Sequence, residues 1–147
     1  MRIGVPKEIK PQENRIGLTP DSVKTLVSEG HEVLVENNGG FEAGFDNDQY
    51  KNAGAKIIEK ATDIFNDAEI IVKVKEPQKV EVEMIKENQI VYTYLHLAAA
   101  KELTEGLVKS KSINIAYETI TDNNGRLPLL APMSAVAGRM SVQAGAH

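Results

Sequence analysis

Residues 69–74 read EIIVKV and residues 89–95 read QIVYTYL, and these two apolar runs decide the fold class. Both runs are short and rich in β-branched or aromatic residues, which is typical of buried strands. Between them, Glu76-Pro77 breaks the first strand and Val80–Lys86 has helical character. Two strands separated by a helical segment predict a βαβ unit, in which the strands are parallel.

The same alternation continues on both sides of this unit. Further strands are predicted at Ile3–Val5, Glu32–Glu36, Ala55–Ile58 and Ile113–Tyr117, and further helical segments at Asp46–Asn52, Thr62–Phe65 and Ala98–Lys109. One more helix begins at Thr19-Pro20-Asp21, an N-cap followed by proline and a first-turn acid, and Gly30 is placed to end it. The pattern predicts an α/β fold with an open, mainly parallel, twisted sheet and helices on both faces.

The last segment, PMSAVAGRMSVQAGAH at residues 132–147, predicts a long helix. Pro132 suits its first turn, and apolar residues recur along one stripe. No C-cap follows, so we expect the stripe to face further sequence or a partner chain. The expected organisation is a domain over residues 1–131 and a connecting helix over 132–147.

Composition narrows the classes of function. The chain has 147 residues, a net charge of −4, 5% aromatic residues and no cysteine. This composition offers no basic or base-stacking surface for nucleic acid, no disulfide scaffold and no thiolate nucleophile. The three histidines lack metal-ligand spacing, so no metal site is expected. We find no secretory signal and no apolar run long enough for a membrane, and therefore expect a cytoplasmic protein.

Three polar residues follow predicted strands. Arg15 lies in the loop after the first strand, while Lys75 and His96 come directly after the runs at 69–74 and 89–95. Ligands of such sheets bind beyond the carboxyl ends of the strands, so we expect these three side chains to converge. A guanidinium binds a carboxylate with two hydrogen bonds, a lysine beside Glu76 can bind a carbonyl or carboxylate, and an imidazole can act as general acid or base.

Each of these residues also has a plainer interpretation. Arg15 could be an ordinary solvated arginine. Lys75 shares a strand face with Lys73, and the two could be exposed lysines at a strand end. His96 could be a hydrogen-bonded core residue, and Tyr94 could serve packing. Composition alone leaves these alternatives open.

Four stretches in order carry a family resemblance: RIGVPKEIKPQENRIGLTP at 2–20, IIVKVKEP at 70–77, YTYLHLAA at 92–99 and GRLPLLAPMSAVAGRMSVQAGAH at 125–147. Together they resemble the N-terminal part of bacterial alanine dehydrogenases. The resemblance implies a Rossmann-like substrate domain over 1–131, an interdomain helix, and an NAD-dependent oxidoreductase that interconverts L-alanine with pyruvate and ammonium. It also implies a homo-oligomer.

The resemblance assigns roles to individual residues. Arg15 and Lys75 would hold the substrate carboxylate and carbonyl, and His96, with Lys75, would be catalytic. Glu76 and Tyr94 would support the substrate site. A further pair, Met133 and Ser134, would lie beside the nicotinamide.

The chain departs from the family in lacking a G-x-G-x-x-G dinucleotide loop. It ends about where the nucleotide-binding domain is expected, so we expect a truncated polypeptide that is inactive alone. One alternative is a transhydrogenase alpha-subunit-like NAD(H)-linked domain, because that subunit also opens with P-K-E…R-x-x-x-T-P. Others are a non-catalytic binding or assembly module that pairs through residues 133–144, or a folded remnant without ligand.

Overall fold

The computed structural model describes residues 1–147 and is built on one sheet of six strands, all of them parallel. The strands are β1 (Arg2–Val5), β2 (Glu32–Glu36), β3 (Lys56–Ile58), β4 (Ile70–Val72), β5 (Ile90–Thr93) and β6 (Ile113–Ala116). Their order across the sheet is β3-β2-β1-β4-β5-β6. The predicted α/β class is therefore confirmed, and each predicted strand is present.

Six α-helices and three short 3₁₀ turns connect the strands. The helices are α1 (Pro20–Ser28), α2 (Asn47–Asn52), α3 (Ala61–Asp67), α4 (Lys79–Val82), α5 (Lys101–Ser110) and α6 (Ala131–Ala146), and the turns are η1 (Phe41–Ala43), η2 (Leu97–Ala99) and η3 (Tyr117–Thr119). The start of α1 follows the predicted cap, because the Thr19 hydroxyl accepts the Ser22 N–H at 3.3 Å. Gly30 lies just past its end with φ +84°, as a C-terminal glycine does.

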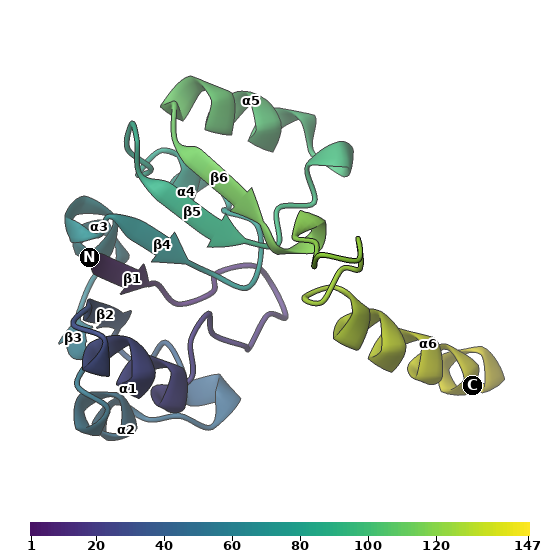
Figure 1. The fold of residues 1–147 in the computed structure, drawn as a ribbon, viewed down its shortest axis with the longest axis horizontal. Helices are drawn as coiled ribbons and strands as arrows, with labels where there is room; N and C mark the ends of the chain where they lie inside the picture. The colour runs from purple at the N-terminus through teal and green to yellow at the C-terminus, as the bar shows by residue number, and fades with distance from the viewer.

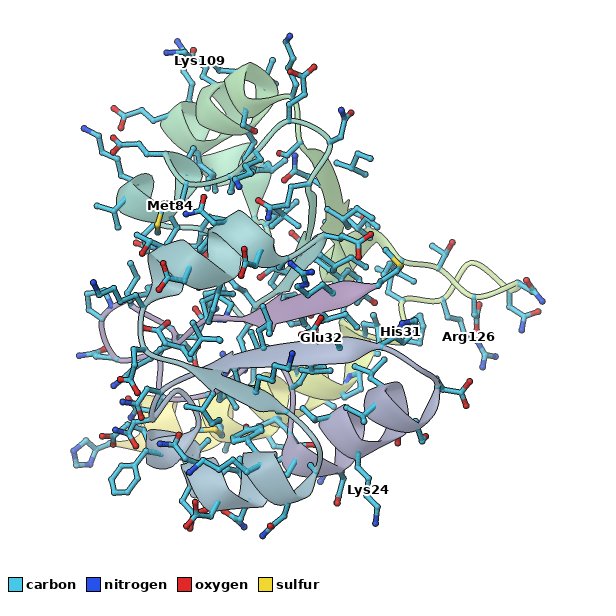
Figure 2. The ribbon with its side chains drawn as sticks, turned by 90° about the vertical axis from the view of Figure 1, so that its left-hand side faces the viewer. Lys24, His31, Glu32, Met84, Lys109 and Arg126 are labelled. Carbon is cyan, nitrogen blue, oxygen red and sulfur yellow. The ribbon has the colours of Figure 1, made fainter.

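Helices cover both faces of the sheet, and each face has its own apolar core (Figure 1). Alternation along β2 places Val33 and Val35 in the core under α1 and α2, and Leu34 in the core under α3 and α5. Lys24 on α1 and Lys109 on α5 point into solvent on opposite sides of the molecule (Figure 2). The central strands are consequently buried on both faces.

The strand order reverses direction between β1 and β4, which lie side by side at the centre of the sheet. The loop after β1, residues 6–19, therefore meets the loop after β4 at the switch point where such folds place their ligands. Gly17 makes the approach close: a Cβ at this position would lie 2.5 Å from the carbonyl oxygen of Val72. The loop that carries Arg15 thus packs directly on the end of β4.

The end of β4 differs from the prediction. The strand stops at Val72 rather than Val74, although the Lys73 N–H still donates to the carbonyl of Tyr92 at 3.1 Å. Lys73 is fully buried, whereas Lys75 is half-buried. The interpretation of these two lysines as an exposed pair is therefore wrong for Lys73.

Helix α6 leaves the body of the molecule and extends away from it (Figure 1). The predicted helix is confirmed with its first residue at Ala131, and every residue from 131 to 147 is exposed. None of the helices combines the length and apolar character needed to cross a membrane.

Candidate substrate-binding site

A cavity of about 370 Å³ opens at the carboxyl edge of the sheet. Its walls come from the β1–α1 loop, the segment around η1, and the chain that follows β4, β5 and β6; they consist of Arg15, Ile16, Gly17, Thr19, Ala43, Phe45, Lys73, Val74, Tyr94 and Tyr117. Two predicted site residues, Arg15 and Tyr94, are brought together here although they lie far apart in the sequence. Topology predicted that Arg15 would meet Lys75 and His96; of these three only Arg15 lines the cavity, and Tyr94 is the residue that the resemblance assigned to the site.

Arg15 presents its guanidinium in a two-pronged ion pair with Glu13. The Nε and Nη2 atoms donate to the two carboxylate oxygens at 2.8 and 2.6 Å, and the Arg15 backbone N–H donates to the same carboxylate at 2.9 Å. The side chain of Arg15 is 50% exposed, that of Glu13 only 8%. Arg15 is thus neither buried nor merely solvated: its local partner holds it in place at the cavity wall.

Lys75 lies close to this pair. Its charge adds to the stronger effect of the Arg15 hydrogen bonds in holding the pKa of the Glu13 carboxyl below its usual value. The backbone of Lys75 is fixed on both sides, because its N–H donates to Glu8 at 3.3 Å and its carbonyl accepts the Thr93 hydroxyl at 2.9 Å. Two cations, Arg15 and Lys75, therefore lower the pKa of one carboxyl group, Glu13.

Behind this surface lies a buried ion cluster that the sequence analysis missed. The Lys73 ammonium is 3.0 Å from Glu8 and 2.7 Å from Glu81, and all three side chains are at most 2% exposed. Glu8 also accepts the backbone N–H of Val74 at 2.6 Å. Burial raises the pKa of Glu81, although the Lys73 charge acts in the opposite direction. One signal existed: a lysine inside an apolar central strand has to find a buried partner.

His96 is exposed and lies immediately before η2. Its backbone is left-handed, with φ +51° and ψ +40°, and its N–H donates to the Glu118 carboxylate at 2.6 Å. The interpretation of His96 as a core residue is therefore wrong. His96 does not line the Arg15 cavity, but it lies two residues after Tyr94, which is in the cavity wall.

An aromatic cluster contributes Tyr94 and Tyr117 to the cavity wall. Tyr117 is in edge-to-face contact with Tyr92 and Tyr94, at centroid separations of 4.3 and 4.8 Å. Burial, together with the neighbouring acidic groups, raises the pKa of the Tyr117 hydroxyl. The Tyr94 hydroxyl donates to the carbonyl of Leu129 at 2.5 Å. Tyr94 therefore has a packing role, as its plainer interpretation held, and it also borders the cavity.

The other predicted residues lie elsewhere. Glu76 forms an ion pair with Lys10 and faces a larger groove of about 870 Å³ between α4 and α5. That groove contains no other predicted site residue and mixes exposed lysines with glutamates. Met133 and Ser134 are exposed on α6, and neither lines the Arg15 cavity. The smaller cavity is the better candidate site because two predicted site residues, Arg15 and Tyr94, line it, whereas the larger groove has one.

The sequence model for the alanine dehydrogenase/PNT N-terminal domain matches residues 4–137. The chain belongs to this family. An alanine dehydrogenase from Staphylococcus epidermidis is 53% identical over all 147 residues, which make up 39% of that relative. Thus the chain spans about two fifths of the length of the curated alanine dehydrogenases it matches.

Solved structures of the family agree. An L-alanine dehydrogenase superposes with a TM-score of 0.93 and 52% identity over 99% of this chain and 40% of the other. A transhydrogenase from Sinorhizobium meliloti superposes with a TM-score of 0.78 and 25% identity, over 84% of this chain and 35% of the other. The family resemblance deduced from the four sequence stretches is confirmed.

Proposed function

We propose that this chain forms the substrate-binding part of an alanine dehydrogenase and binds pyruvate, or L-alanine, in the Arg15 cavity. Residues 1–131 would be the substrate domain, with residues 132–147 as the connecting helix. The observation that carries the proposal is the convergence of Arg15, Tyr94 and the nearby Lys75 charge at the switch point of the sheet. Similarity to alanine dehydrogenases over the whole chain supports it.

The geometry supports a division of tasks among the cations. Arg15 is half-exposed, so a guanidinium N–H remains for a substrate carboxylate in addition to those that Glu13 occupies. Lys75 would bind the carbonyl oxygen and draw electron density from the carbonyl carbon, where ammonia adds. The carbinolamine then loses water, and the exposed imidazole of His96 would supply and accept the protons of that step. Glu76, the chain neighbour of Lys75, would support the site, although its side chain faces the larger groove.

The reaction of the family also needs NAD, which supplies or accepts the hydride when bound. Met133 and Ser134 are the residues of this chain proposed to lie near it. They are exposed on α6 outside the cavity, and an open helix face does not by itself enclose a dinucleotide. We therefore derive no step through this cofactor from the residues present.

Pyruvate titration followed by NMR tests the proposal. We expect saturable shifts of the Arg15 and Lys75 side-chain signals at millimolar pyruvate, and loss of the Lys75 response in Arg15→Ala. Arg2→Ala is the matched control, because Arg2 is also a partly exposed arginine in an ion pair but lies at the opposite edge, beside Glu32. If wild type does not respond, or if Arg15→Ala responds as wild type does, pyruvate binding at this cavity is contradicted.

A transhydrogenase-like role is the second candidate, favoured by the superposition on the S. meliloti protein. It predicts a response to NAD(H) without a response to pyruvate. A third candidate is an assembly module, favoured by the full exposure of α6, including Val136 and Met140 at 58% each. It predicts concentration-dependent self-association in sedimentation, and a monomer at high concentration contradicts it.

A further inference from the structure

Two loops at the carboxyl edge are held in the same way, by a glutamate carboxylate that accepts two successive backbone N–H groups. After β4, the Glu8 carboxylate accepts the backbone N–H groups of Val74 and Lys75; after β5, the Glu118 carboxylate accepts those of Leu95 and His96. In each case the glutamate comes from another loop of the sheet, and in each case the second N–H belongs to a proposed catalytic residue. The two glutamates differ in one respect: Glu8 is buried in an ion cluster, whereas Glu118 is half-buried with no cation bridged to it.

The Glu118 contacts are strong ones. The His96 N–H lies 2.6 Å from Oε1, and the Leu95 N–H lies 3.1 Å from Oε1 and 3.2 Å from Oε2. Hydrogen bonds to an ionised acceptor are shorter and stronger than neutral ones. Two adjacent N–H groups on one carboxylate fix the direction in which the chain leaves β5.

The conformation that these bonds hold is one that His96 would not favour by itself. With φ +51°, His96 is in the left-handed region, which a residue with a Cβ seldom adopts. The turn η2 starts at the next residue, so the rotation at His96 redirects the chain from the strand into η2 and α5. The backbone from which the imidazole projects is consequently held by a carboxylate 22 residues away in sequence.

We infer that Glu118 is a positioning residue for His96, holding the backbone of residues 95–96 so that the imidazole projects from a fixed point at the carboxyl edge. The inference rests on the proposed function only in that His96 acts on the substrate. It assigns Glu118 no contact with substrate. Loss of a glutamate that only stabilised the fold would speed amide exchange equally throughout the domain. Loss of a positioning residue would speed it at residues 95–96 in particular.

Glu118→Gln in the 147-residue chain tests the inference, because glutamine keeps the size of the side chain and removes the charge. We expect the His96 and Leu95 amides to exchange with solvent at least about tenfold faster, since bonds to a charged acceptor are worth more than this factor. The His96 ring shift on adding pyruvate should fall by about half or more, while the Arg15 response remains. Glu118→Asp, which keeps the charge with a shorter reach, should give intermediate exchange.

Glu105→Gln is the matched control, because Glu105 is an exposed glutamate. Its only charged partner is Lys101, which is also exposed and lies 3.7 Å away. The substitution should leave exchange at His96 unchanged. The inference is overturned if Glu118→Gln exchanges at His96 as wild type does, or if protection falls equally at β2 and β5. Absence of any pyruvate response in wild type would instead refute the proposed function, and the exchange data would still decide whether Glu118 holds the His96 backbone.

Discussion

Two charged clusters lie within one edge of the sheet, and they are built in opposite ways. In the closed cluster, Lys73 lies between Glu8 and Glu81 with at most 2% of any side chain exposed. In the open cluster, Arg15 holds Glu13 with half of its side chain in solvent. Both clusters border the same cavity, through Lys73 and Arg15.

The difference indicates that the closed cluster stabilises the fold and the open cluster is suited to binding. A buried charge needs full pairing, so the closed cluster tolerates no exchange of partners and locks the loops after β1 and β4 together. The open cluster has an acceptor, Glu13, of the same chemical kind as a substrate carboxylate. A carboxylate ligand can therefore share Arg15 with Glu13, because half of the Arg15 side chain remains in solvent.

The largest expected effect is on the closed cluster. Lys73→Met should lower the free energy of unfolding by about 3–5 kcal/mol, because it leaves two buried carboxylates without their cation. Lys75→Met is the matched control: the same substitution two residues later, at a half-buried side chain, should cost about 1 kcal/mol or less. Urea denaturation of both variants measures the difference. Equal losses of stability would show that Lys73 and Lys75 belong to one cluster.

Much of the fold could be predicted from local pattern. The runs at 69–74 and 89–95 are too apolar and β-branched for another structure, and Thr19 and Gly30 mark the ends of α1 by their own chemistry. The end of β4 could not be predicted, since it depends on Glu8, which is 65 residues from Lys73 in sequence. Strand ends set by distant side chains leave no local signal.

Part of the candidate site could also be predicted from the sequence, and part could not. Topology predicted that Arg15, Lys75 and His96 would converge, because loops after parallel strands share one edge of the sheet, but of the three only Arg15 lines the cavity. It could not predict the partners Glu13, Glu8 and Glu118, because glutamates in loops are ordinary surface residues until the fold brings them to unpaired N–H groups. The role of a buried or edge carboxylate is therefore visible only in three dimensions.

The two clusters differ in the direction in which acid changes their contribution to the free energy of unfolding. The folded pKa of Glu13 is lowered from its usual value of about 4.5, chiefly by hydrogen bonds from Arg15. The stabilisation is therefore complete above about pH 4.5 and is lost as the pH falls through the lower, folded value. In Glu13→Gln this loss should be absent. The substitution should lower the free energy of unfolding near neutral pH by up to about 1 kcal/mol in low salt.

Glu81 provides the opposite case for the same measurement. Burial raises its folded pKa, so its protonated form favours folding, and the stability it contributes falls as the pH rises from about 4.5 through the raised value.

Urea denaturation in small pH steps tests the Glu13 prediction. The loss of stability in acid should be weaker in Glu13→Gln than in wild type. If wild type and Glu13→Gln lose stability in parallel below pH 4.5, the Arg15 pair contributes nothing to folding.

The smallest expected effect concerns the link from the cavity to the segment before α6. Tyr94→Phe removes the hydroxyl that donates to the Leu129 carbonyl, and should cost about 0.5 kcal/mol because the bond is exposed. Tyr92→Phe is the control, since Tyr92 shares the edge-to-face packing on Tyr117 but its hydroxyl bonds to no protein group. Limited proteolysis at residues 120–130 should quicken in Tyr94→Phe alone. Equal rates in both variants would mean that ring packing, rather than the hydroxyl, holds this segment against the rest of the molecule.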